Sequence, residues 1–280
     1  MAYILHDPNI SGMQLNPFDV YHLSVGDDSL AIRWAISKGV KYKHFTSVAM
    51  KSGDLRFLQY LRQKGCPWNR QTTYEASANG HLNCLRYAME NGCEWGLSIT
   101  VIAASNGHVD CLKYLHEFGC PWGFDVCFEA ARRDHLDCLI YAHTEGCEWN
   151  EMTSAEAAAN GSIRCLKYAY DNGCPWDEDV CNLAVSHGHL DCVKYLGEIG
   201  CKWNSSSCTF AASRGHLDIL KYLYELGIPF GKRTCYMAAK RGHLNCLIYA
   251  TEMGCPWNKE DCKSITDPNI LNYLHNNGLC

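Results

Sequence analysis

The chain repeats itself every 27 residues, and this period constrains its fold more than any other feature. One column of the repeat holds Gly53, Gly80, Gly107, Asp134, Gly161, Gly188, Gly215 and Gly242. A second column holds Tyr60, Tyr87, Tyr114, Tyr141, Tyr168, Tyr195, Tyr222 and Tyr249. Eight consecutive units without an insertion indicate a solenoid, which grows by stacking units rather than by enlarging one core.

Each unit has the pattern of two short helices. In residues 177–200, Asp177 is a favourable N-cap and Gly188 a left-handed stop, so we expect a first helix that ends near His187. A second helix should follow from Leu190 to Ile199. Residues of N-cap type recur in one column, which predicts where the first helices begin: Asn69, Gly96, Gly123, Asn150, Asp177, Asn204, Gly231 and Asn258.

The two ends of the chain follow the pattern less closely. Asn16-Pro17 is a cap followed by proline, Gly26 and Gly39 end two helices at altered spacing, and the second-helix pattern returns at 269–274 after a three-residue deletion. Counting these ends gives about ten helix pairs, because capping repeats are atypical. We therefore expect an extension at 1–15 and one solenoid over 16–280, with irregular end repeats at 16–52 and 258–280.

Several segments resemble ankyrin repeats. Gly107-His108-Val109-Asp110-Cys111 and its counterpart at 188–192 are similar to the start of the second ankyrin helix, and Ala211-Ala212 matches the paired alanines of the first. The motif at 172–177 resembles divergent ankyrin-like repeats that are abundant in giant viruses of amoebae and in some protists. The resemblance covers about residues 40–280 and implies an all-α solenoid of helix-turn-helix repeats.

This sequence departs from the usual ankyrin pattern in two ways. Its unit of 27 residues is shorter than the usual repeat of about 33. The Thr-Pro-Leu-His motif is also absent, and Asp179-Val180-Cys181-Asn182 stands in its place. We therefore expect the projecting β-hairpin fingers to be missing, and with them any recognition that depends on fingers.

Cysteine is unusually frequent, with 19 residues, and 18 of them fall on three columns of the repeat. The first column directly follows the second helix: Cys66, Cys93, Cys120, Cys147, Cys174, Cys201 and Cys255. The second lies early in the second helix: Cys84, Cys111, Cys138, Cys165, Cys192 and Cys246. The third lies inside the first helix: Cys127, Cys181, Cys208, Cys235 and Cys262. Only Cys280 stands outside every column, as a thiol without a packing role.

The three cysteine columns indicate buried positions for a small apolar side chain. They also accept Phe57, Ile219, Ile228, Thr73, Thr100 and Ser154, which neither a disulfide nor a metal site would tolerate. Successive cysteines of one column should lie about 8–10 Å apart, beyond the roughly 7 Å that a disulfide permits between Cα atoms. We expect reduced, buried thiols and a reducing compartment, with a zinc or thiol-redox protein as the less favoured alternative.

Histidine and tryptophan also recur with the period. The histidines are His81, His108, His135, His189, His216 and His243, with Asp54 and Ser162 in the two other places. We expect their rings to hydrogen-bond the turn between helices rather than to bind metal. The tryptophans are Trp68, Trp95, Trp122, Trp149, Trp176, Trp203 and Trp257, each directly before an expected N-cap. This is the position of a hydrophobic staple, so Trp176 should cover Cys181; an aromatic cage for a cationic ligand is the alternative.

Composition and motifs exclude several classes of function. The net charge of −5 and the acids that follow the second-helix cations by four residues argue against nucleic-acid binding. No run of about 18 apolar residues predicts a membrane span, and the first residues lack a secretory signal. Phosphate-loop, zinc-protease and nucleophile-elbow motifs are absent, so we expect no enzyme activity and no cofactor.

The exposed stripe of the first helices varies freely from repeat to repeat, and it includes the aromatic and arginine side chains common in binding hot spots. The ankyrin resemblance implies that first helices line the concave face of the stack. We therefore predict a non-enzymatic scaffold that binds a protein partner through Tyr74, Glu75, Phe128, Glu129, Arg132, Asn182, Phe210, Arg233, Tyr236 and Lys240.

Two alternatives remain open for this stripe and for the whole chain. The stripe residues could instead pack against the short loops or be merely solvated. The chain could be a structural or virion-assembly protein that self-associates. The resemblance to giant-virus repeats further implies a host protein as the partner and the host cytoplasm or the virion as the location.

Overall fold

The computed structural model describes residues 29–280 except 38, 41 and 43, so the expected extension at 1–15 and the caps at Asn16 and Gly26 lie outside it. The described residues form helices joined by turns and include no strand. The prediction of an all-α repeat fold without β-hairpin fingers is therefore confirmed for this part of the chain.

The chain divides into two compact units. The first extends to Ala130 and includes Asp137–Cys147, and the second comprises Ala131–Leu136 and Glu148–Cys280. Helices of the first unit are α2 (Ser29–Ser37), α3 (Phe45–Ser52), α4 (Leu55–Gln63), α5 (Arg70–Ala78), α6 (Leu82–Glu90), α7 (Ile99–Ser105) and α8 (Val109–Glu117), followed by α9 (Phe124–Arg132) and α10 (Leu136–Thr144), in which the division falls.

The second unit continues the alternation of first and second helices. Its elements are α11 (Glu151–Ala159), α12 (Ile163–Asp171), α13 (Glu178–His187), α14 (Leu190–Glu198), α15 (Ser205–Arg214), α16 (Leu217–Glu225), α17 (Thr234–Lys240), α18 (Leu244–Glu252), the 3₁₀ helix η3 (Lys259–Ser264) and α19 (Pro268–Asn276). The prediction that residues 16–280 form one continuous solenoid stays a prediction.

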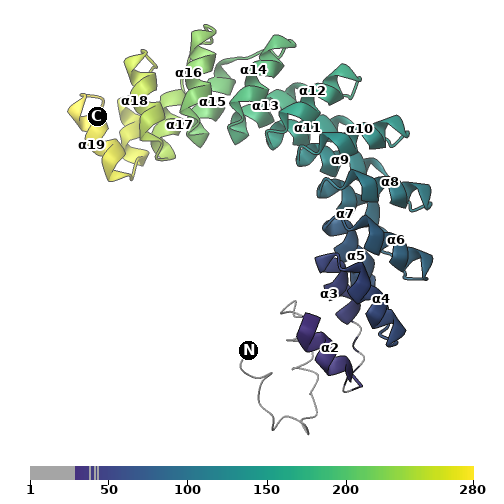
Figure 1. Ribbon diagram of the computed structural model, residues 1–280. Helices are drawn as coiled ribbons and strands as arrows, with labels where there is room; N and C mark the ends of the chain where they lie inside the picture. The colour runs from purple at the N-terminus through teal and green to yellow at the C-terminus, as the bar shows by residue number, and fades with distance from the viewer. Residues whose placement is uncertain (1–28, 38, 41, 43) are drawn as a thin grey trace, which may run out of the picture. The chain divides into compact units, whose positions relative to one another are not determined.

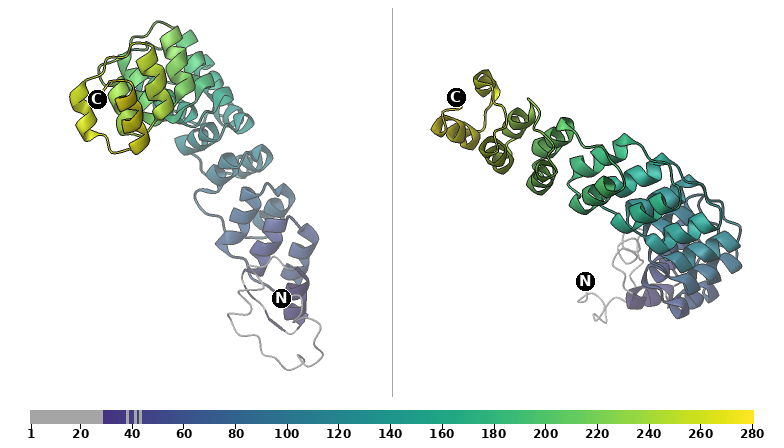
Figure 2. Two further views of the ribbon diagram at one scale, coloured as in Figure 1. Left: turned by 90° about the vertical axis from the view of Figure 1, so that its left-hand side faces the viewer. Right: turned by 90° about the horizontal axis from the view of Figure 1, so that it is seen from above.

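Within each unit the helices stack in two layers. First helices pack on first helices, as in α3, α5 and α7 of one unit and α11, α13, α15 and α17 of the other. Second helices form the other layer, with α4, α6 and α8 in one unit and α12, α14, α16 and α18 in the other. Figure 1 shows this most clearly for α13–α18, and Figure 2 shows the same rows from two other sides.

The core between the layers is built from small side chains. Helix α13 buries Cys181, Ala184 and Val185, while α14 buries Cys192 and Leu196. These positions recur at helical spacing, so each helix turns one apolar stripe toward its partner. Fifteen cysteines are free and all fifteen are buried, as expected for a small hydrophobe.

The N-cap column is confirmed at its polar members. Asn69 accepts a hydrogen bond from the Thr72 amide at 2.9 Å, and Asn150, Asp177, Asn204 and Asn258 cap in a similar way. The prediction was wrong at Gly96 and Gly231, where α7 starts only at Ile99 and α17 at Thr234. At both places a turn precedes the first helical residue, whereas α9 starts at Phe124, directly after Gly123, so glycine in this column does not by itself delay the helix.

The histidine column ties each repeat to the one before it. The ring Nε2 of His81 donates to the carbonyl of Lys51 at 3.1 Å, and His216 donates to Ser186 at 3.0 Å. Each acceptor lies 30 residues earlier, at the end of the preceding first helix. The histidine rings therefore do hydrogen-bond the backbone, but the acceptors are carbonyls at the end of the preceding repeat's first helix and not the turn between helices that was expected. Where serine replaces histidine, the Ser162 hydroxyl makes the same kind of bond to a carbonyl 30 residues earlier, at 3.2 Å.

The prediction that all cysteines are free thiols was wrong for four of them. A disulfide joins Cys181 to Cys201, whose Cα atoms lie 6.3 Å apart. The two residues belong to the third and first columns of one repeat, whose paired helices bring them within the roughly 7 Å that a disulfide permits. Neither of the two disulfides joins successive members of one column.

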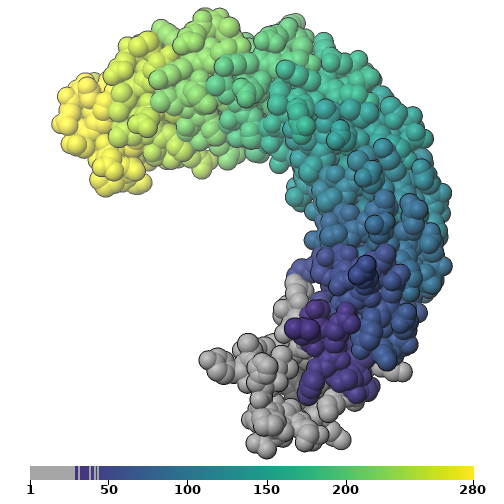
Figure 3. All heavy atoms as spheres, in the orientation of Figure 1, coloured from purple at the N-terminus to yellow at the C-terminus, as the bar shows by residue number. Residues whose placement is uncertain are grey.

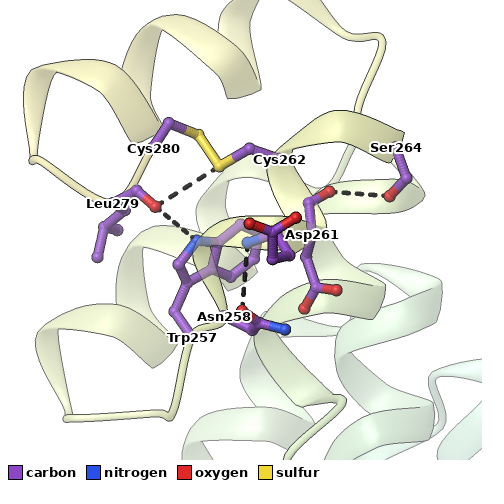
Figure 4. The surroundings of a disulfide bond; sticks show 8 residues. Trp257, Asn258, Asp261, Cys262, Ser264, Leu279 and Cys280 are labelled. Carbon is purple, nitrogen blue, oxygen red and sulfur yellow. Dashed lines mark hydrogen bonds between the residues drawn. A yellow bond between two sulfur atoms is a disulfide. The ribbon is translucent and has the colours of Figure 1, made fainter.

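The second disulfide gives Cys280 a partner, contrary to the prediction of an isolated thiol. It joins Cys280 to Cys262 of η3, with Cα atoms 5.9 Å apart (Figure 4). Beside it, the indole of Trp257 donates to the carbonyl of Leu279 at 2.8 Å. The shortened last repeat brings the end of the chain back against its own first helical segment, which no column of a regular repeat could reveal.

The tryptophans contact the tyrosine column. Trp68 packs edge-on against Tyr87 with ring centroids 6.2 Å apart, and Trp149 packs in the same way against Tyr168. The Trp68 indole also donates to the carbonyl of Asn91 at 3.0 Å. Trp68 and Trp149 therefore join the start of a repeat to its second helix, whereas Trp176 packs against Tyr170 of the preceding second helix. A staple over the third cysteine column stays a prediction.

Candidate interaction surface

The candidate surface lies on the first helices of the second unit. In α15, Cys208, Ala211 and Ala212 are buried against the second-helix layer, so the opposite stripe faces outward. That stripe carries Phe210, a large apolar side chain that remains 41% exposed. Figure 3 shows the surface of this unit in green to yellow.

An open groove of about 860 Å³ runs over this stripe. Its walls come from three successive repeats, with Ser186 from α13, the outer residues of α15, and α17 with the turn that precedes it. Apolar side chains in the lining are Phe210 and Met237, and hydroxyl side chains are Ser186, Ser205, Ser206, Thr209 and Ser213.

Gly231 lets the turn before α17 lie directly against α15. A Cβ atom at this position would meet the Ser205 carbonyl oxygen and the Thr209 hydroxyl at 3.3 Å. Across the same contact, the Thr209 hydroxyl lies 3.0 Å from the hydroxyl of Thr234, which also accepts from the Gly231 amide at 3.0 Å. Hydrogen bonds between neighbouring repeats therefore hold this part of the groove.

The charged side chains of the lining are all cationic. They are Arg214, Lys232, Arg233 and Arg241. The imidazole of His243 also lines the groove, and no aspartate or glutamate is among the lining residues. Within the described part of the chain, none of these four cations has a carboxylate within salt-bridge distance. The groove is therefore a site of uncompensated positive charge on a chain with a net charge of −5.

Of the residues predicted for partner binding, Phe210 and Arg233 come together in this groove. Tyr236 and Lys240 lie nearby on α17, with the Lys240 ammonium 5.4 Å from the centre of the Tyr236 ring. Hydrogen bonding to Lys240, and then to Ser264, lowers the pKa of the Tyr236 phenol. These two residues stand beside the groove rather than in its lining.

The other predicted residues are not part of the groove. Tyr74 is 43% exposed on α5, and its neighbour Glu75 accepts a hydrogen bond from Gln71 at 2.7 Å. Phe128, Glu129, Arg132 and Asn182 are each half-buried on α9 and α13. Their role in partner binding stays a prediction.

Comparison with known proteins identifies the repeat. The sequence pattern of ankyrin repeats, in a form that spans three copies, matches residues 73–153 and again 154–234, together more than half of the chain. The chain belongs to the ankyrin-repeat family. No curated protein matches the sequence.

Solved structures match this ankyrin-repeat chain as well. One is the ankyrin repeat domain of human ASB11, which is 19% identical in sequence, with a TM-score of 0.49. The match covers 56% of this chain and 84% of that domain. Ankyrin-repeat proteins generally act as modules for protein–protein interaction rather than as enzymes. No helix among the described residues is long and apolar enough to cross a membrane.

Arg214, Lys232 and Arg241 were not among the predicted residues, although the sequence contains a signal for them. Arg214 and Arg241 directly precede the glycines at the ends of first helices, and Lys232 follows Gly231 in the turn before α17, so all three fall outside the stripe defined by helical spacing. The segments 199–217 and 226–243 contain six lysine or arginine residues and no acid. A search for charge that is unbalanced within a repeat would have found the groove.

Proposed function

We propose that the protein is a non-enzymatic scaffold that binds a protein partner through the outward face of its first helices. The observation that carries this proposal is the open groove over α13, α15 and α17, with Phe210 and Arg233 in its lining. Exposed aromatic and arginine side chains are the types that contribute most to protein interfaces. The hydrogen bonds beneath them hold the backbone in place, so a partner meets an organised surface.

Affinity capture with the full chain tests this proposal. Wild type would be compared with a first-helix variant, Phe128→Ala with Tyr236→Ala, and with a second variant, Phe210→Ala with Arg233→Ala. A matched control, Lys194→Ala with Lys221→Ala, changes exposed residues of the second helices α14 and α16. Captured proteins would be measured by quantitative mass spectrometry, and circular dichroism would verify the fold of every variant.

We expect a defined set of proteins that the control retains and that at least one first-helix variant loses. Retention by both first-helix variants together with loss in the control would place binding on the other layer and contradict the proposal. Light scattering of the purified chain tests the alternative, which is self-association. Growth of large particles with rising concentration, without a captured partner, would favour a structural role.

A further inference from the structure

Within the second unit, positive charge without acids distinguishes α15 and α17 from the first helices α11 and α13. Acids are present in α5, α9, α11 and α13, for example Glu75 in α5 and Asp179 in α13. In α15 and α17 the only charged residues are Arg214 and Lys240, both cationic. The first helices of the second unit therefore change from acidic in α11 and α13 to cationic in α15 and α17, and the cationic part coincides with the groove.

The cations of the groove are arranged around an apolar centre. Arg214, Lys232, Arg233 and Arg241 line the same opening as Phe210 and Met237. All four are exposed, so each can reach a ligand without the desolvation that burying a charge requires. Guanidinium groups form paired hydrogen bonds with carboxylates, which adds geometric selectivity to the attraction of opposite charges.

We propose that this groove binds an acidic, extended segment of a partner protein, with carboxylates paired to the four cations and an apolar side chain against Phe210 and Met237. This inference rests on the proposed function and names the chemistry of the partner. Uncharged hydroxyl groups between the cations, such as those of Ser205 and Ser206, add hydrogen-bond donors for the backbone of the segment.

The surroundings of the groove favour a peptide over a nucleic acid. A nucleic-acid site follows the phosphate backbone with a continuous basic track and stacks bases on several aromatic rings. Here the second-helix layer carries acids such as Asp218 and Glu225, and η3 carries Glu260 and Asp261. Phe210 is the one aromatic residue of the lining other than the imidazole of His243. The positive charge is thus confined to a short span.

The length of the segment follows from the repeat. Helices of neighbouring repeats pack about 10 Å apart, so three repeats span about 20 Å and an extended chain crosses them in about six residues. The probe is therefore a fluorescein-labelled peptide of about ten residues, rich in aspartate and glutamate, with leucine at its centre. A second peptide replaces every acid by glutamine or asparagine, and a third carries phosphoserine in place of the acids.

Binding to the full-length protein would be measured by fluorescence anisotropy. The groove variant is Arg233→Glu with Arg241→Glu, and the matched control is Lys194→Glu with Lys221→Glu, which changes the net charge equally on the second helices. Melting curves would show whether each variant keeps its fold.

We expect the acidic peptide to bind and its amide counterpart to bind at least about tenfold more weakly. The groove variant should lose at least about tenfold in affinity and the control less than about twofold. Raising the salt concentration from about 0.05 M to about 0.3 M should weaken binding, because the cations are exposed.

Three results would overturn the inference. They are equal losses in the groove variant and the control, tighter binding of the phosphoserine peptide or of a single-stranded oligonucleotide than of the acidic peptide, and no binding of the acidic peptide at all. Each leaves the proposed function standing if affinity capture still depends on the first helices, so the two failures are distinguishable.

Discussion

At the scale of single residues, the contact between repeats depends on a glycine in one repeat and a histidine in the next. A Cβ atom at Gly188 would lie 2.5 Å from the ring of His216, closer than real Cβ contacts come. In the column of glycines that end the first helices, one position is occupied by another residue, Asp134, whose φ is 57°. The residue in the place of the facing histidine is Ser162, so the exception in the glycine column coincides with one of the two exceptions in the histidine column.

Asp134 replaces the lost contact with its own bonds. Its carboxylate accepts from Arg164 Nε at 2.8 Å and from the Cys165 amide at 3.1 Å, while Ser162 donates to the Arg132 carbonyl. Two departures that look independent in the sequence are therefore one alternative way of joining two repeats. Periodicity could not predict this, because it treats each column separately.

The two positions should be energetically coupled. Ser162→His alone should lower the free energy of unfolding by about 1–3 kcal/mol, because the ring meets the Cβ of Asp134. Adding Asp134→Gly should recover most of that loss by restoring the arrangement of the other repeats. Urea unfolding of the two single variants and the double variant gives the coupling. Additive effects would show that the two residues act separately.

At the scale of helices, the period predicted the order of the elements and most of the core, because burial repeats wherever the spacing repeats. The period predicted less well at single positions where the structure departs from the rest of the column. After Gly96 and Gly231 the helices α7 and α17 start late, although α9 starts directly after Gly123 of the same column. One disulfide joins different columns of one repeat, and the other involves Cys280, which belongs to no column, so the spacing along single columns predicted neither. The groove was missed in part because its lining combines helix ends and turns from three repeats.

The buried thiols should react slowly in the native protein. Burial, with a smaller effect from the neighbouring aspartate, raises the pKa of Cys111 and of Cys192 to about 12. A raised pKa keeps the thiol protonated near pH 8, and the protonated thiol is a poor nucleophile.

The measurement is titration with Ellman's reagent at pH 8. We expect little reaction of the native chain and 15 reactive thiols in denaturant, because four of the 19 cysteines are in disulfides. Prior reduction should raise the number in denaturant to 19. A value of 19 without reduction would mean that the disulfides do not form in solution. The predicted reducing compartment is a separate expectation that this titration does not decide.

At the scale of the whole molecule, repeats contact their neighbours at constant sequence offsets. His216 and His243 bind carbonyls at the same offset, those of Ser186 and Ser213. In such a chain, stability is approximately a sum over repeats and their interfaces. Removing one whole period should therefore bring equivalent residues together again.

Deletion of residues 190–216 tests this expectation within the second unit. His189 would then precede Leu217, and His243 would meet the Ser186 carbonyl in place of the lost Ser213 carbonyl. We expect a folded helical protein with a lower melting temperature, since one repeat and one interface are gone. Deletion of 190–212, which is not a whole period, should melt at a markedly lower temperature. Equal melting temperatures for the two deletions, measured by circular dichroism, would contradict the register argument.

The pairing of Asp134 with Ser162 also bears on the history of the chain. If the exceptional repeats descend from the glycine–histidine form, the two substitutions could not have arisen in either order with equal ease. A side chain gained first at position 134 would have met a histidine ring, whereas serine at 162 beside glycine leaves only a small gap and keeps a hydroxyl for the same carbonyl. On that premise, the loss of the ring came before the gain of the carboxylate or together with it.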